Sequence, residues 1–122
     1  MRIQVSGDSG AARVLEGYLA KAGYQVTDFR PACTVTVEEG ESAGNIVLEG
    51  NGGALAAEAQ RAIAELTATP IEMRRAGESD RAIRVVTTGR EDDSYAIERG
   101  LLRAVLRVTE HGNKSKWRIF GK

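Results

Sequence analysis

The stretch R-I-Q-V-S-G-D-S-G-A-A-R-V-L at Arg2–Leu15 decides the fold of this 122-residue chain. Apolar and polar residues alternate over Arg2–Ser6, which is the period of a half-buried strand. A glycine turn begins at Gly7, and the apolar residues beyond it recur at helical spacing. The stretch therefore predicts a strand that passes through a glycine turn into a helix, which Asp8 or Ser9 can cap.

The same kind of turn recurs twice further along the chain. The stretch L-E-G-N-G-G-A-L at Leu48–Leu55 is a close copy of the first turn, and V-T-T-G at residues 86–89 is a looser one. Each turn stands after a strand pattern and before a helical pattern, so we expect three strand–turn–helix units. The three helices are expected to end near Gly23, near Thr67 and at Gly112.

The remaining strand patterns lie between these units. Glycine turns at residues 40–44 and 77–80 separate two pairs of strands, and we expect a hairpin at each. The order is βα, ββα, ββα, and it predicts an α/β (α+β-like) fold of one domain over residues 1–122, with a mixed, partly antiparallel sheet and three helices. The expected strands beyond Arg2–Ser6 cover residues 24–28, 33–38, 45–49, 71–75, 82–87 and 117–120.

Composition indicates a globular protein outside the membrane. The chain is 42% hydrophobic and 28% charged, which is typical of soluble domains. No apolar run approaches the ~20 residues that span a bilayer, and the start lacks the apolar segment of a signal peptide. Cys33 is the only cysteine, so neither an intrachain disulfide nor a thiolate zinc cluster can form. These features favour the cytoplasm.

The net charge of zero conceals an asymmetry between the two parts of the chain. Residues 1–73 carry a formal charge of −5, and residues 74–122 carry +5. A positively charged part of this kind can form an anion-binding surface. The alternative is attraction between the two parts, either within the fold or between subunits.

The first unit resembles the opening βαβ unit of Rossmann-type nucleotide-binding proteins over residues 2–28, I-Q-V-S-G-D-S-G-A-A-R-V-L-E-G-Y-L-A-K-A-G-Y-Q-V-T-D from Ile3 onwards. Gly7 matches the first glycine of that family's loop and Ala12 matches the third, while Ser9 stands where the family has its middle glycine. Asp28 matches the acid that binds a ribose hydroxyl. The resemblance implies that a nucleotide pyrophosphate binds at this turn.

Both glycine turns are candidate anion sites. A helix start presents unpaired amides and the positive end of the helix dipole, which together attract phosphate. The alternative is that each turn only joins a strand to a helix, and its duplication favours that interpretation. Neutral Asn51 makes the second turn more favourable for an anion than Asp8 makes the first. The expected ligand-binding residues of the two turns are Gly7, Ser9, Gly10, Asn51, Gly52 and Gly53.

The basic face of the third helix and the basic tail form another candidate site. Arg99, Arg103 and Arg107 recur every four residues and so share one face of the helix. Guanidinium groups bind phosphate through paired hydrogen bonds, and Trp117 can stack on a base. The alternative is a solvated helix face followed by an edge strand. Arg99, Arg103 and Trp117 are accordingly the further expected ligand-binding residues.

No set of residues has the spacing of a catalytic centre. His111 is the only histidine, and nothing in the sequence pairs it with Ser9 or Cys33 as nucleophile. The acids at residues 91–93 favour a helix start rather than a magnesium site, because adjacent helical residues do not share a face. No lysine follows either glycine turn as in a phosphate-binding loop of the Walker type. We therefore expect neither a cofactor nor a metal.

Three functions remain open on the sequence. The first is non-enzymatic binding of a small anionic ligand, for sensing or sequestration, with a nucleotide or an ADP-ribose-like molecule as the favoured ligand. The second is a homo-oligomeric assembly module, or nucleic-acid binding through the basic C-terminal part. The third is an enzyme whose site is shared between subunits. A pI near 6.6 is low for a dedicated nucleic-acid binder.

Overall fold

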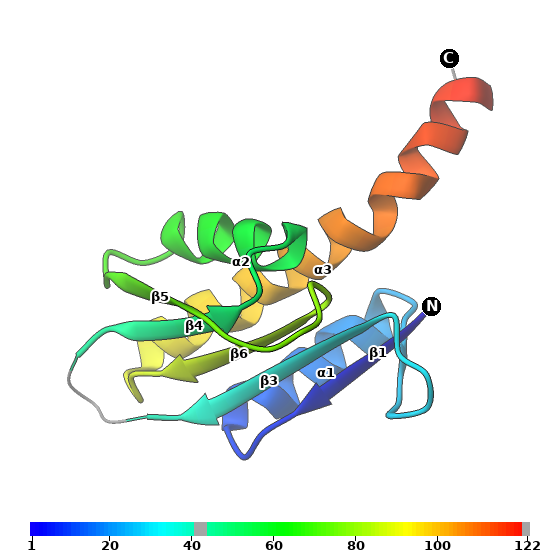
Figure 1. The fold of residues 1–122 in the computed structure, drawn as a ribbon. Helices are drawn as coiled ribbons and strands as arrows, with labels where there is room; N and C mark the ends of the chain where they lie inside the picture. Colours follow the sequence, from blue (N-terminus) through cyan, green and yellow to red (C-terminus); the bar gives the residue numbers. More distant parts are fainter. Residues whose placement is uncertain (41–43, 121–122) are drawn as a thin grey trace.

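The structure, a computed structural model, describes residues 1–40 and 44–120, with side chains up to Thr109. Within these residues, six strands form one sheet in the order β2-β1-β3-β6-β4-β5, and three helices pack on it (Figure 1). This arrangement confirms the α/β fold with a mixed sheet. The elements are β1 (Arg2–Ser6), α1 (Gly10–Lys21), β2 (Gln25–Val26), β3 (Cys33–Glu39), β4 (Ile46–Gly50), α2 (Ala54–Ala64), β5 (Ile71–Arg75), β6 (Ala82–Thr87) and α3 (Glu91–Phe120).

Strand direction divides the glycine turns between two ends of the sheet. β1, β2, β3 and β6 pair in parallel, whereas β4 runs antiparallel to β6 and parallel to β5. The turns at Gly7 and Gly89 therefore follow strands that end together, at what we call the Gly7 end of the sheet. The turn at Gly52 follows β4 and lies at the opposite end, which we call the Gly52 end. α2 consequently starts at the other end of the molecule from α1 and α3.

One face of the sheet carries the core. Alternate residues of the strands are buried, as the period-2 pattern predicts, and the helices cover that face. α3 packs between α1 and α2, so all three helices lie on the same side (Figure 1). The largest fully buried side chains are Ile3, Leu15, Leu19, Ile46, Leu48, Leu55, Ile63, Ile97, Leu101, Val35, Val37 and Val85.

Gly100 sets the closest approach of α2 and α3. A Cβ atom at Gly100 would lie 2.6 Å from Cγ1 and 2.9 Å from the amide nitrogen of Ile63. A glycine inside a helix costs about 1 kcal/mol relative to alanine. Here the missing side chain lets the two helices pack backbone to backbone. In the described residues, no helix combines the length and the apolar character needed to cross a membrane.

Both expected hairpins are wrong. β6 lies between β3 and β4, so neither β3 with β4 nor β5 with β6 forms a neighbouring pair. The reason is burial: β6 alternates buried Ile83 and Val85 with more exposed residues and pairs on both sides, whereas β5 is mostly exposed. The buried residues of β6 favour a central position in the sheet, and the exposed, charged residues of β5 favour an edge position.

The expected C-terminal strand over residues 117–120 is also wrong. α3 continues through Gly112 to Phe120, and the side chains from residue 110 onwards, Trp117 and His111 included, lie outside the described part. A helix satisfies its backbone hydrogen bonds locally, while a strand needs a free edge to pair with. One interior glycine, at about 1 kcal/mol, does not have to end a helix. The end of α2 also differs from the expectation, because this helix ends at Ala64 rather than near Thr67.

Candidate functional site

The structure places the expected binding residues in separate regions. The first turn lies at the Gly7 end and the second turn at the Gly52 end, with the length of the strands between them. The two arginines lie along α3, and the side chain of Trp117 lies outside the described residues. The two turns are therefore separate candidates. The expected binding residues thus form three groups: Gly7, Ser9 and Gly10 in the first turn, Asn51, Gly52 and Gly53 in the second turn, and Arg99, Arg103 and Trp117 in α3.

The Gly7 turn is occupied by the protein itself. Gly7 has a φ of +105°, and a Cβ atom there would lie 2.0 Å from the carbonyl oxygen of Val37. The buried Ser9 hydroxyl accepts a hydrogen bond from the amide of Ala11 at 3.0 Å, which confirms it as the cap of α1. The amide of Ser9 donates to the Val37 carbonyl at 3.4 Å. The space that the missing side chain of Gly7 leaves is therefore filled by the backbone of β3.

The Gly52 turn leaves the start of α2 without a side-chain cap. Gly53 is the N-cap residue of α2, and no side chain caps the helix. The first amides of an α-helix have no partner within the helix, so they need a cap, water or a ligand. Gly52 has a φ of +77°, a conformation that side chains rarely adopt. This turn therefore presents unpaired amides at the positive end of a helix dipole.

Arg75 lies against the Gly52 turn. Its Nη2 atom is 3.2 Å from the position that a Cβ atom of Gly52 would take. Among the described residues, the Arg75 side chain has neither an ion-pair nor a hydrogen-bond partner, and it is exposed. The neighbouring Arg74, in contrast, is paired with Glu72 at 2.5 Å. Sequence analysis missed Arg75, which reaches the turn only because β4 and β5 are neighbours in the sheet.

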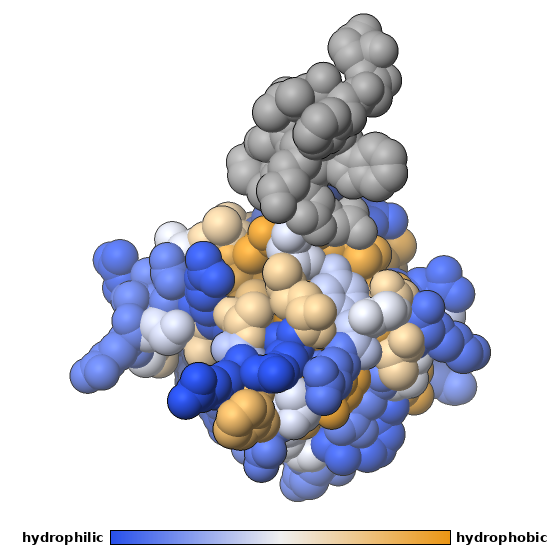
Figure 2. Space-filling model, turned by 90° about the vertical axis from the view of Figure 1, so that its right-hand side faces the viewer, coloured by the Kyte–Doolittle hydropathy of each residue, from blue (hydrophilic) through white to orange (hydrophobic). Residues whose placement is uncertain are grey.

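The connection between β5 and β6 encloses the Gly52 turn from the other side. The Asn51 side-chain amide donates to the carbonyl of Glu78 at 3.2 Å, so Asn51 anchors this connection. A Cβ atom at Gly53 would lie 2.4 Å from the Cβ atom of Asp80, so the glycine is required for the close approach. Figure 2 views the Gly52 end of the molecule, where tan, more hydrophobic residues lie in the centre and blue, hydrophilic residues lie on both sides and below.

The arginines of α3 have partners of their own. Arg103 forms an ion pair with Glu65 at 2.7 Å. The guanidinium carbon of Arg99 lies 4.5 Å from the centre of the Tyr95 ring, which is a cation–π contact. Both are surface interactions, and both hold α3 side chains against nearby residues.

The described aromatic side chains differ in how free they are to stack on a base. Tyr24 packs against the core and its hydroxyl bonds to that of Thr109, while Tyr95 is covered on one face by Arg99. Phe29 is 59% exposed, and the guanidinium carbons of Arg2 and Arg30 lie over its ring, at 5.1 and 5.5 Å from the ring centre. Arg2 begins β1, so this group lies at the Gly52 end.

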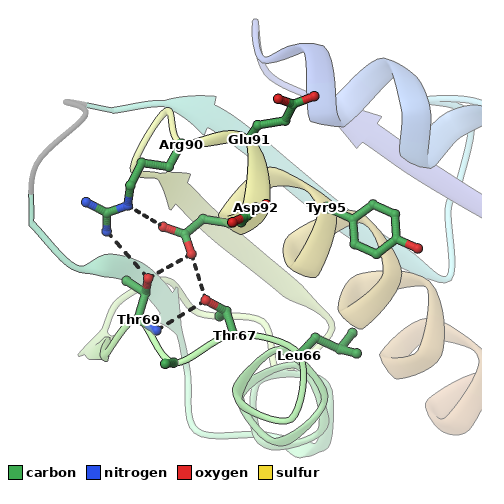
Figure 3. A pocket seen from close by; sticks show the side chains of 9 residues that line it. Leu66, Thr67, Thr69, Arg90, Glu91, Asp92 and Tyr95 are labelled. Atoms are coloured by element: carbon green, nitrogen blue, oxygen red, sulfur yellow. Dashed lines mark hydrogen bonds and ion pairs between the residues drawn. The ribbon is translucent and has the colours of Figure 1, made fainter.

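A pocket of about 630 Å³ opens at the Gly7 end, between the segment after α2 and the start of α3 (Figure 3). Buried Asp93 holds this region together: its Oδ1 atom accepts hydrogen bonds from the hydroxyls of Thr67 and Thr69, both at 2.8 Å. Its Oδ2 atom accepts from Thr88 at 2.6 Å and from Nε of Arg90 at 3.0 Å. In Figure 3 the Glu91 side chain points away from these groups.

The Asp93 cluster is a structural clamp. Burial by itself raises the pKa of the Asp93 carboxyl, but the hydrogen bonds from the three threonines and Arg90 outweigh it and lower the pKa from 3.8 to about 2. Asp93 is therefore ionised at neutral pH with both oxygens already bonded, a poor general base. Residues 91–93 form the first turn of α3, as the sequence predicts. The hydrogen bonds of Asp93 with Thr67 and Thr69 were not predicted.

The described residues offer neither an activated cysteine or serine nucleophile nor a cluster of metal ligands. Cys33 is 2% exposed, and burial raises the pKa of its thiol, which keeps the thiol neutral. The Ser9 hydroxyl is engaged in the cap of α1. Within the part of the chain that the structure describes, no group of three or more histidine, cysteine, aspartate or glutamate side chains is placed to hold a metal ion.

Comparisons with protein-family models, with curated proteins and with solved structures find no match for this chain.

Proposed function

We propose that the chain is a non-enzymatic binding protein for a small anionic ligand, which it senses or sequesters, and that the ligand's phosphate binds at the Gly52 turn. One observation carries the proposal: the uncapped start of α2 lies beside Arg75, whose side chain is unpaired within the described residues. The cytoplasm is the compartment that we expect for this function.

The chemistry of the turn suits a phosphate group. Unpaired amides at a helix start donate hydrogen bonds to phosphate oxygens, and the helix dipole favours a negative charge there. A guanidinium adds charge-assisted hydrogen bonds with a defined geometry. Gly52, which carries no side chain, leaves the backbone accessible beside Arg75. The Gly7 turn lacks this combination, because its capping position is filled by Ser9.

A nucleotide or an ADP-ribose-like molecule is the ligand class that we propose. Phe29 supports this choice, because its ring is 59% exposed and lies at the same end of the sheet as the Gly52 turn, and a base that stacks on the ring takes the place of Arg2 or Arg30. Stacking of a base on an aromatic side chain contributes about 1–3 kcal/mol. The two arginines add positive charge for a second phosphate.

Replacing Arg75 by glutamine is expected to weaken the binding of ADP about tenfold to a hundredfold, because a charge-assisted hydrogen bond contributes about 1.5–3 kcal/mol. Isothermal titration calorimetry on the wild type and on Arg75→Gln measures the change. Arg61→Gln is the matched control, since Arg61 is exposed in the last turn of α2, at the opposite end of that helix from the Gly52 turn. The control should bind as the wild type does.

Inorganic phosphate and adenosine separate the two parts of the ligand. Binding of phosphate that depends on Arg75 supports the turn as the anion site, and binding of adenosine that is lost in Phe29→Ala supports the base site. If the wild type binds none of these at millimolar concentration, or if Arg75→Gln binds ADP as tightly as the wild type, the proposed function is wrong.

A further inference from the structure

β5 is an edge strand with an unused row of backbone groups. It stands last in the sheet order and pairs only with β4 among the described strands. The amide of Ile46 donates to the Pro70 carbonyl at 3.1 Å, and the amide of Ala76 donates to the Gly50 carbonyl at 2.9 Å. In a parallel pair the bonding residues alternate, so even-numbered residues of β5 face β4. Ile71, Met73 and Arg75 therefore direct their amides and carbonyls outward.

We propose that a second copy of this chain binds along β5, antiparallel and with its two-fold axis at Met73. The two sheets then join into one, and the outward groups of Ile71, Met73 and Arg75 pair with those of Arg75, Met73 and Ile71 of the second copy. A two-fold axis makes the contact self-complementary and closed. The opposite edge strand, β2, has two residues and offers far fewer groups.

The charges of β5 match this register. With Met73 opposite Met73, Glu72 stands opposite Arg74 of the second copy, and Arg74 stands opposite its Glu72. These are the positions of an antiparallel pair that are not hydrogen-bonded, where side chains come closest. Glu72 and Arg74 already form an ion pair within one chain, and both side chains are about half exposed, at 43% and 55%. The dimer extends this pair into a network of four alternating charges.

Met73 supplies the apolar contact at the axis. It is 41% exposed, on an edge strand that is otherwise largely charged. Register places Met73 beside Leu48, so its side chain lies on the face of the sheet that carries the core. Two methionines facing each other across the axis would cover one another. The Arg75 side chain, which the proposed ligand site uses, takes no part in the charge network.

Charge reversal on one strand at a time tests this dimer. Sedimentation velocity should give twice the mass of the chain for the wild type. Glu72→Arg places like charges opposite each other twice in its own dimer, and so does Arg74→Glu, so each variant alone should sediment as a monomer. A one-to-one mixture of the two variants restores opposite charges at both positions and should form the heterodimer. Lys21→Glu, an exposed reversal on α1, is the control and should remain dimeric.

Recovery in the mixture shows that both variants are folded, because an unfolded chain cannot restore a dimer. Met73→Pro provides an independent check, since residue 73 donates no hydrogen bond to β4 and a proline blocks only the outward pairing. It should give a monomer with unchanged circular dichroism. A monomeric wild type, single reversals that stay dimeric, or a mixture that stays monomeric would each overturn the proposal.

Discussion

Replacing Asp93 by asparagine is expected to lower the free energy of unfolding at pH 7 by about 3 kcal/mol, because a buried and paired carboxylate leaves its partners unsatisfied when it is removed. The asparagine side chain has nearly the same shape, so packing is retained. It has one acceptor oxygen in place of two, and its amide group cannot accept from Arg90. Thr67, Thr69 and Thr88 then compete for the remaining oxygen.

Thermal unfolding followed by circular dichroism measures this effect. For a domain of this size, 3 kcal/mol corresponds to a fall in Tm of roughly 10 °C. Asp92→Asn is the matched control, because Asp92 is the exposed neighbour of Asp93. Its free energy of unfolding should change by about 0.5 kcal/mol or less. Equal losses in both variants would show that Asp93 is not the clamp described above.

The contribution of Asp93 should depend on pH in a defined direction. Its pKa is about 2 in the folded chain, lowered from 3.8, so the folded state favours the charged carboxylate. This difference contributes about 2–3 kcal/mol of stability above pH 5, and the contribution is lost as the pH falls through 4 toward 2. The gap in unfolding free energy between wild type and Asp93→Asn should therefore narrow on acidification. A gap that stays constant down to pH 2 would contradict the low pKa.

Replacing Gly7 by alanine is expected to lower the free energy of unfolding by about 3 kcal/mol or more. An alanine at a positive φ costs about 1–3 kcal/mol by itself. Its Cβ atom would also lie 2.0 Å from the carbonyl oxygen of Val37 and 2.7 Å from the carbonyl carbon, so the turn has to move away from β3. The amide of Ser9 then loses its bond to the same carbonyl.

Gly10→Ala is the control for this variant. Gly10 is the first residue of α1, and a Cβ atom there meets no other atom within 4 Å. Alanine favours the helix over glycine, so this variant should be neutral or more stable by up to about 1 kcal/mol. Urea unfolding of both variants measures the difference. A Gly7→Ala variant as stable as the wild type would mean that the turn can leave β3 without cost.

Local patterns predicted the elements of this fold up to the start of α3, whereas the strand expected over residues 117–120 is part of that helix. The alternation of β1 and β3, the Ser9 cap, and the apolar stripes of the helices depend on residues close in sequence, and the structure has each of them. Strand pairing depends instead on which strands can be buried on both sides. Only β6 has the burial of a central strand, whereas β5 is mostly exposed. The expectation of hairpins ignored this difference.

The candidate site was predicted in part for the same reason. The Gly52 turn could be found because it copies the Gly7 turn, and Asn51 distinguished the two. Arg75 is far from that turn in sequence and meets it only through the pairing of β4 with β5. The Asp93 clamp likewise joins the segment after α2 to the start of α3, and the hint in the sequence was a threonine-rich segment before β5. Contacts of this kind need the sheet order, which turns and periodicity do not reveal.

The most direct test of the proposed binding site is a titration of the isotope-labelled chain with ADP, followed through the amide signals in two-dimensional NMR spectra. If the account is right, the amides from Gly52 to Leu55 and the side chain of Arg75 shift and saturate together, while the amides from Gly7 to Ala11 stay unchanged. Saturable shifts at the Gly7 turn instead, or no saturable shift at either turn up to millimolar ADP, would contradict it.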